Sequence, residues 1–267
     1  ALERNRKKYD LQSKQLKGTE KRDKYKVYGE LINTYGYNLE PGSKELTALN
    51  YYTNEEITIP LDPTQTPGEN AQRYFAKYNK QKRTFEALTE LIQETADDIQ
   101  YLESISNALD IALSEADLAQ IKEELMQSGY IRRKHTKKKV KLTSKPMHYI
   151  SSDGYDMYVG KNNLQNEELT FSFANGNDWW FHAKGAPGSH VIVKSGGDEL
   201  PDRTFEEAGR LAAYYSKNRG ADKVEIDYVE KKQVKKPGGG KPGFVVYYTN
   251  YSMVIDSNIS QIRLCAD

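Results

Sequence analysis

Two long stretches of the chain repeat apolar side chains with the period of a helix. Residues 1–35 are mostly polar, and the sevenfold spacing of Leu2, Tyr9 and Leu16 indicates a narrow coiled-coil seam. Residues 67–127 hold a longer seam with steps of three and four residues. Its positions are Phe85, Leu88, Ile92, Thr95, Ile99, Leu102, Ser106, Leu109, Leu113 and Ala116. We therefore expect two helices that pair as an antiparallel hairpin.

The segment between these helices predicts its own local structure. In "ALNYYTNEEITIPLDP" two short apolar runs flank residues 53–55, which is typical of a β-hairpin. Thr66, Pro67 and Glu69 then have the types and spacing of an N-cap, a first helical residue and a capping-box carboxylate. Residues 1–130 are thus predicted to be a coiled-coil arm with a small β-hairpin module near residues 47–62, at its apex.

From Met147 onward the pattern changes to short apolar runs separated by turns. Asp153 and Gly154 lie between two alternating runs, a strong hairpin signal. Residues 202–220 contain the one clear helix of this part, and Gly220 is its stop. The runs "LTFSFA", "DWWFHAKG", "SHVIVKS", "KVEIDYVEKKQV" and "GFVVYYTNYSMVIDS" are interpreted as strands. Residues 147–267 are therefore expected to form a compact α+β domain, and α+β is the expected class of the chain.

Charge is distributed unevenly, although the formal net charge is only +1. Ten Lys or Arg lie between Arg4 and Lys26, against the four acids Glu3, Asp10, Glu20 and Asp23, and eleven acids with one base lie between Glu86 and Glu124. An antiparallel hairpin would place these two runs side by side, so charge complementarity is the favoured explanation and ligand binding the alternative. Residues 131–146 contain eight bases and no acid. Composition favours equally a solvated linker and a segment that contacts phosphates.

Composition narrows the classes of function. The hydrophobic fraction is 37% and the mean hydropathy is −0.82, which suits a globular domain joined to a solvated helical element. One cysteine, Cys265, excludes an internal disulfide and a multi-cysteine metal site. The first residues are charged, and no apolar run approaches a membrane span, so a cytoplasmic location is expected. The absence of a start methionine indicates a fragment.

Enzyme chemistry finds little support in the residues. The histidines lack metal-ligand spacing, and no GxSxG motif surrounds Ser189, so no catalytic residue, metal or cofactor is expected. Two glycine-rich loops, residues 184–190 and 236–243, instead lie among lysines. Their backbone N–H groups could approach a phosphate closely, and the lysines would add charge. The alternative is that the second loop is a solvated hairpin tip.

The stretch "NDWWFHAKGAPGSH" contains both tryptophans of the chain. Because side chains alternate along a strand, Trp179 and Phe181 would share a core face, while Trp180, His182 and Lys184 would share the other. The second face offers an aromatic surface for a base and cations for phosphate. Burial of both tryptophans in the core is the alternative, and for Trp180 the two interpretations stay open.

The chain resembles the NFACT family over nearly its whole length. Residues 154–171, 178–193, 206–217 and 235–247 resemble the family's C-terminal RNA-binding module, and residues 49–80 its middle coiled-coil region. The family's N-terminal domain and helix–hairpin–helix segment are missing, and the loop 236–243 is richer in glycine than in relatives. With this resemblance, RNA contacts are expected from Lys161, Asn162, Asn163, Trp180, His182, Lys184, Gly185, Gly188, Ser189, His190, Lys235, Lys236 and Lys241.

The resemblance implies a role in ribosome quality control. Such a protein binds the stalled large ribosomal subunit, tRNA and peptidyl-tRNA, and it supports mRNA-independent alanine tailing of the nascent chain. Peptidyl transfer stays with the ribosome, so the chain is not expected to be an enzyme. The alternative is an adhesin at the cell surface, without a signal peptide, that binds host fibronectin or fibrinogen as a second role of the same protein. The lack of a signal, an anchor and disulfides favours the first.

Overall fold

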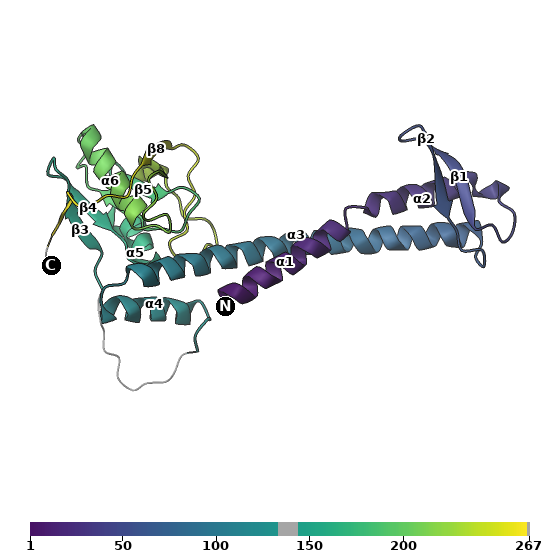
Figure 1. Ribbon diagram of the computed structural model, residues 1–267, viewed down its shortest axis with the longest axis horizontal. Helices are drawn as coiled ribbons and strands as arrows, with labels where there is room; N and C mark the ends of the chain where they lie inside the picture. The colour runs from purple at the N-terminus through teal and green to yellow at the C-terminus, as the bar shows by residue number, and fades with distance from the viewer. Residues whose placement is uncertain (133–143, 266–267) are drawn as a thin grey trace. The chain divides into compact units, whose positions relative to one another are not determined.

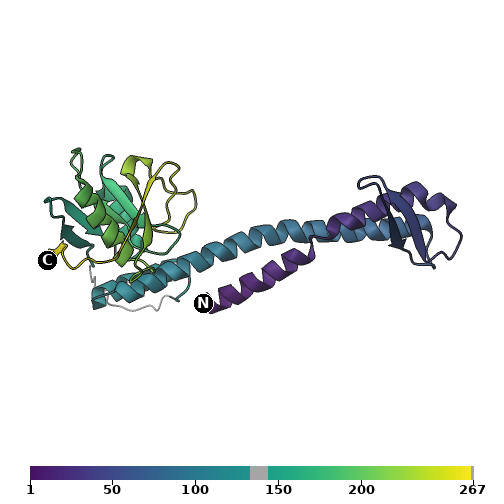
Figure 2. The same cartoon turned by 45° about the horizontal axis from the view of Figure 1, so that its top comes forward.

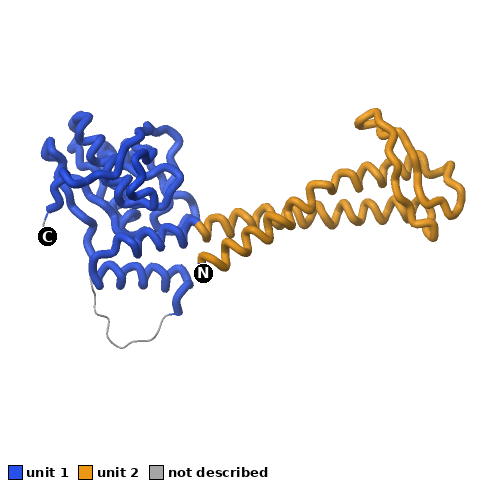
Figure 3. The backbone as a smooth tube through the Cα atoms, viewed as in Figure 1, with its two compact units in different colours: residues 1, 100–267 blue, residues 2–99 orange. Residues whose placement is uncertain are grey.

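The computed structural model describes residues 1–132 and 144–265, which divide into two compact units (Figure 1 and Figure 3). Residues 2–99 form the first unit, and residues from Gln100 onward, with Ala1, form the second. The long helix α3 (Pro67–Ile111) contributes to both. The division between the two units therefore lies within α3. Most of the basic segment 131–146 lies outside the described residues.

The first unit packs a two-stranded hairpin against helices. It contains α1 (Leu2–Gly18), α2 (Arg22–Tyr35), the 3₁₀ turn η1 (Gly36–Asn38), β1 (Glu45–Asn50), β2 (Glu55–Pro60) and the first part of α3. The expected hairpin is formed, with Glu45 opposite Pro60 in antiparallel register. Its inward side chains join α2 and α3 in one core, which consists of Leu31, Ile32, Leu46, Ala48, Ile59, Ala71 and Tyr74.

The helix α3 begins at the expected capping box. The Thr66 backbone N–H donates to Glu69 Oε2 at 2.8 Å, and the Glu69 N–H donates to Thr66 Oγ1 at 3.2 Å. The helix predicted over 67–127 is, however, broken: α3 ends at Ile111, and α4 covers Glu115–Gln127. A second capping box, between Ser114 and Asp117, starts α4. The heptad pattern continues through this break, which is why periodicity alone missed it.

The seam of α1 differs from the one expected. Asn5 and Gln12 are the buried residues of this helix, whereas Tyr9 is 36% exposed. Leu2 and Leu16 are half-buried. The helix therefore buries polar side chains at the same sevenfold spacing, and it contributes little apolar surface to the first unit.

The second unit is built on one antiparallel sheet with the strand order β8-β7-β5-β6-β4-β3-β9. The strands are β3 (Met147–Ile150), β4 (Asp156–Val159), β5 (Trp179–Ala183), β6 (Val191–Val193), β7 (Val224–Glu230), β8 (Tyr251–Ile255) and β9 (Arg263–Leu264). The hairpin expected at Asp153 and Gly154 joins β3 to β4. Together with the helices, this sheet confirms the α+β class.

Both faces of the sheet are covered. The helix α6 (Asp202–Tyr214) lies on one face and packs on the core that contains Phe181 and Val191. The other face carries Trp180, Ile192 and Val229. Its cover consists of the π-helical turn η2 (Leu169–Phe173) after α5 (Asn163–Glu168), the turn η3 (Lys231–Gln233) and the segment 234–247. This second cover was not expected, because "LTFSFA" was interpreted as a strand.

Candidate nucleic-acid interface

A pocket of about 290 Å³ opens beside β5 in the second unit. Residues 185–188 of the first glycine-rich loop line it, and so does Gly243, the last residue of the second, together with Phe244, Val245 and Tyr247. Ser104 and two neighbouring residues of α3 line another side. Part of the expected RNA-contact set lies in this lining, namely Asn163, Trp180, His182, Gly185, Gly188 and His190.

Four ring side chains of the lining pack against one another. The Trp180 ring is stacked on His182 at a centroid distance of 5.7 Å, and it contacts His190 and Tyr247 at 5.1 Å each. The two imidazoles meet edge to face at 5.4 Å. These distances are in the range of favourable ring contacts, so the cluster gives the pocket a preformed, flat-sided lining.

Both imidazoles of this cluster are neutral at physiological pH. Burial lowers the pKa of His182 to about 4, and it lowers the pKa of His190 well below the usual value. His190 Nδ1 lies 2.7 Å from Thr170 Oγ1. A neutral imidazole can donate at one nitrogen and accept at the other. The pocket therefore suits an uncharged, planar, polar group such as a nucleobase better than it suits a phosphate.

Of the two interpretations left open for Trp180, the structure shows burial in the core. Its side chain is fully buried, since η2 and the segment 234–247 cover its face of the sheet. Its Nε1–H has no hydrogen-bond partner in the part of the chain that is described. Trp179, which was assigned to the core, is half-buried and packs edge to face on Phe205 of α6. Alternation separated the two rings correctly, but it could not show that both faces are covered.

Tyr247 is a site residue that the sequence did not single out. Its hydroxyl donates to Asp227 Oδ2 at 2.8 Å, and Ser252 Oγ donates to Asp227 Oδ1 at 2.6 Å. Asp227 is 4% exposed and lies opposite His182 in the β5–β7 register. The carboxylate thus fixes the Tyr247 ring at the pocket. An aromatic run directly after a glycine-rich loop was the available signal, but "GFVVYY" was interpreted as strand.

The lysines of the two loops lie outside the pocket lining. Lys184 Nζ is 2.5 Å from Glu225 Oε1, and this ion pair raises the pKa of Lys184. Lys236 Nζ is 2.6 Å from Glu167 Oε1, and Lys235 is exposed. Lys241 Nζ lies 4.7 Å from the centre of the Tyr101 ring. Exposed ion pairs are weak, so a phosphate at the rim can compete for these ammonium groups.

Lys161, Asn162 and Asn163 contact α4, and of these three only Asn163 also lines the pocket. Lys161 Nζ lies 2.7 Å from Asp117 Oδ1. Asn162 Nδ2 donates to Gln120 Oε1, and Asn163 Nδ2 donates to Glu124 Oε1, each at 2.8 Å. These three residues attach α4 to the sheet, which explains why α4 and the sheet belong to one unit.

Ser189, which was also expected to contact RNA, is buried in the structure. It is 1% exposed and lies outside the lining of the pocket, and its backbone N–H donates to the Tyr215 carbonyl. Gly188, directly before it, has little room for a side chain, because an added Cβ would lie 3.0 Å from Ser216 Cβ. This part of the loop therefore packs on the residues that follow α6.

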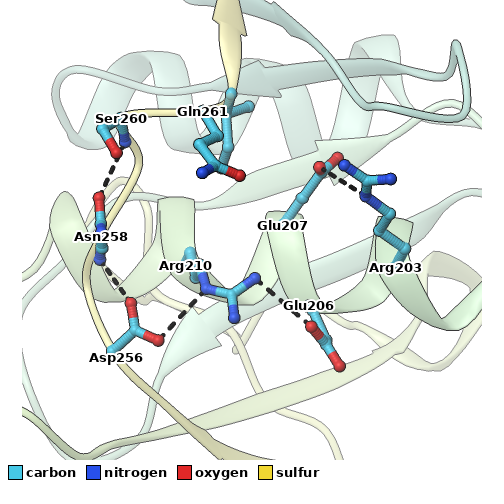
Figure 4. Close-up of a pocket in the computed structure, with 9 residues that line it drawn as sticks. Arg203, Glu206, Glu207, Arg210, Asp256, Asn258, Ser260 and Gln261 are labelled. Atoms are coloured by element: carbon cyan, nitrogen blue, oxygen red, sulfur yellow. Dashed lines mark hydrogen bonds and ion pairs between the residues drawn. The ribbon is translucent and has the colours of Figure 1, made fainter.

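A second hollow, of about 350 Å³, lies between α6 and residues 256–262 (Figure 4). Its cations are matched by carboxylates: Arg210 pairs with Glu206 and Asp256, and Arg203 pairs with Glu207. Figure 4 shows these side chains directed at one another across the surface of the helix. Since its charges are already satisfied, this hollow is a weaker candidate than the pocket beside β5.

Neither a metal-holding group of side chains nor a membrane-spanning helix is found among the described residues. Across residues 1–132 and 144–265, His, Cys, Asp and Glu form no group of three or more that could hold a metal ion. Over the same residues, no helix has both the length and the apolar character that a membrane span requires. What the structure does present is an α+β binding module with a ring-lined pocket, joined to helices.

Family models identify this module. Residues 1–144 match the NFACT N-terminal and middle domains, and residues 145–248 match the NFACT protein RNA binding domain. The chain belongs to the NFACT family. It is 44% identical over 247 residues to the Rqc2 homolog RqcH of Streptococcus pneumoniae, and 40% identical over 249 residues to that of Bacillus subtilis. These alignments cover 92% and 91% of the chain, but only 44% and 43% of those proteins.

Two further similarities extend the comparison. The chain is 34% identical over 90 residues to the Drosophila melanogaster ribosome quality control complex subunit NEMF homolog, covering 33% of the chain and 9% of that protein. The solved C-terminal part of the fibronectin/fibrinogen-binding protein from Streptococcus suis has a similar fold, with a TM-score of 0.74 at 38% identity. That match covers 98% of this chain and 93% of the other.

Proposed function

We propose that the second unit binds RNA and that its pocket receives an unstacked base. The observation that carries this is a neutral, ring-lined pocket bordered by residues 185–188 and Gly243, most of whose lining falls within the residues that match the RNA-binding model. Single-stranded bases are bound through ring contacts and hydrogen bonds to their edges, while cations hold the backbone. His182 and Tyr247 would contact the base, and Lys184 and Lys235 would contact phosphates at the rim.

A role in ribosome quality control follows as a wider proposal. The chain would bind the stalled large ribosomal subunit, tRNA and peptidyl-tRNA, and it would support mRNA-independent alanine tailing in the cytoplasm. It would act by binding, because the ribosome itself performs peptidyl transfer. The names of the bacterial and Drosophila relatives support this role. The chain spans less than half the length of these relatives, so the role concerns a larger protein.

Exchange of His182 for alanine tests the pocket. We expect His182→Ala to weaken binding of the chain to tRNA about tenfold, the loss of roughly one ring contact. His148→Ala is the matched control, since His148 is a half-buried histidine of the same unit that stacks on Tyr158 away from the pocket. Fluorescence anisotropy with labelled tRNA gives both affinities. Equal affinities of two folded variants would remove the pocket from RNA binding.

The name of the structural relative supports a second candidate function, adhesion to fibronectin or fibrinogen. Immobilised fibronectin and tRNA can be offered to the same chain over a series of salt concentrations. Specific adhesion predicts saturable fibronectin binding that survives physiological salt and is unaffected by competing tRNA. Binding that disappears with salt in parallel with tRNA binding would instead be non-specific attraction between charges.

A further inference from the structure

The middle of the helical arm collects positive charge. We define the basic belt as residues 14–26 and 73–83, at the junction of α1 and α2 and in the facing part of α3. The belt contains eleven Lys or Arg and two acids, a net charge of +9, whereas the whole chain carries +1. It lies entirely within the first unit, and thus outside the residues that match the RNA-binding model.

The two segments of the belt are in direct contact. Tyr25 stacks on Tyr74 at 6.1 Å, and the Arg22 guanidinium lies 4.0 Å above the centre of the ring of Phe85, just beyond the belt. Lys77 Nζ lies 5.5 Å from both tyrosine rings. Figure 1 and Figure 2 both show α2 running alongside α3. The charge complementarity expected between the paired helices is therefore absent at the belt, because α2 lies against a basic part of α3.

Little in the first unit neutralises the belt. Lys26 pairs with Glu30 at 3.8 Å, and Arg73 pairs with Asp62 at 3.1 Å. The acids that interrupt or adjoin the belt are Glu20, Asp23 and Glu86. Eight exposed cations have no ion pair within the described residues: Lys14, Lys17, Lys21, Lys24, Lys77, Lys80, Lys82 and Arg83. The surfaces of soluble proteins usually intersperse positive and negative side chains, so this excess of positive charge indicates a polyanionic ligand.

We propose that the basic belt binds the phosphate backbone of a double-stranded RNA, separately from the pocket of the second unit. Phosphate contacts need cations and no apolar patch. The exposed large apolar side chains of the described arm, such as Leu11, Tyr52 and Leu91, all lie outside the belt. An acidic protein partner would bury an apolar centre as well, and the belt offers none. The tyrosines under Lys24 and Lys77 support the lysine stems.

Removal of three charges from α3 tests the belt in the whole chain. The variant Lys77→Gln/Lys80→Gln/Lys82→Gln is compared with Lys7→Gln/Lys8→Gln/Lys44→Gln, which removes three exposed lysines of the same unit from outside the belt. Affinity for a double-stranded RNA oligonucleotide is measured against salt. We expect the belt variant to bind at least tenfold more weakly at 150 mM salt, and its log–log salt slope to fall by about 2–3. The control variant keeps at least two thirds of the parent slope.

Three outcomes would overturn the proposal. One is an equal loss of slope in the two triple variants, with circular dichroism showing both to be helical. Another is a belt variant that loses binding to poly-glutamate but retains binding to RNA, which would indicate an acidic protein partner. The third is a lack of additivity with His182→Ala, because separate sites should contribute independently. A belt effect alongside an ineffective His182→Ala would reject the pocket and leave the belt intact.

Discussion

At the scale of single residues, Gly243 sets one wall of the pocket. Its φ of +77° is unfavourable for residues with a side chain, and an added Cβ would lie 3.0 Å from Asn163 Cβ. We expect Gly243→Ala to lower the free energy of unfolding by about 2 kcal/mol, from backbone strain and overpacking together, and to weaken RNA binding. Urea denaturation measures the first effect and anisotropy the second.

Gly239 provides the matched control for this substitution. Its φ is +71°, but an added Cβ would meet no atom within 4 Å. Gly239→Ala should therefore cost only the backbone part, about 1 kcal/mol, and it should leave RNA affinity unchanged. Equal costs at the two glycines would show that the contact with Asn163 is unimportant.

His182 should make the stability of the second unit sensitive to acid. Its pKa is about 4 in the folded protein and about 6.5 when unfolded, so the unfolded chain binds the proton first as the pH falls. This stabilisation is fully present above pH 6.5 and is lost toward pH 4, by up to about 3 kcal/mol. Urea denaturation from pH 7.5 to 4.5 should be less pH-dependent for His182→Gln. The prediction would be contradicted if the free energy of unfolding of His182→Gln depended on pH as steeply as that of the parent. An equal reduction of this pH dependence in His148→Gln would contradict it as well.

At the scale of elements, the attachment of α4 to α5 depends on a buried carboxyl group. Glu124 has no exposed surface, burial raises its pKa, and Asn163 donates to it. We expect Asn163→Ala to cost about 2 kcal/mol, because Glu124 then lacks this donor. Adding Glu124→Gln should restore part of the loss, since a neutral amide tolerates burial better. Urea denaturation of both variants checks this, with Asn250→Ala as an exposed control. A double variant less stable than Asn163→Ala would refute the explanation.

Elements with strong local signals could be predicted, and those stabilised by distant contacts could not. The capping box at Thr66 and the hairpin turn at Gly154 are local, and both formed as expected. Residues 169–173 look like a strand by alternation, yet they form a π-helical turn that covers the Trp180 face. The break before Ser114 was also missed. In both cases tertiary packing decides between conformations that the local pattern allows.

At the scale of the whole molecule, the sum of the charges hides their arrangement. Residues 14–26 and 73–83 are far apart in sequence, and only the fold brings them together as the basic belt. The candidate pocket shows the same limit. The sequence indicated His182 and both glycine-rich loops, but it could not show that the first loop and Gly243 share a pocket with Tyr247. Nor could it show that Lys161 and Asn163 contact α4.

The burial of Trp180 has a practical consequence for spectroscopy. The chain has two tryptophans, and they occupy opposite faces of one strand. Trp180 lines the pocket and contacts both of its imidazoles, while Trp179 packs on α6. Replacement of Trp179 by phenylalanine would leave Trp180, beside the pocket, as the single tryptophan of the chain. Emission and quenching would then report occupancy of the pocket directly, without an attached dye.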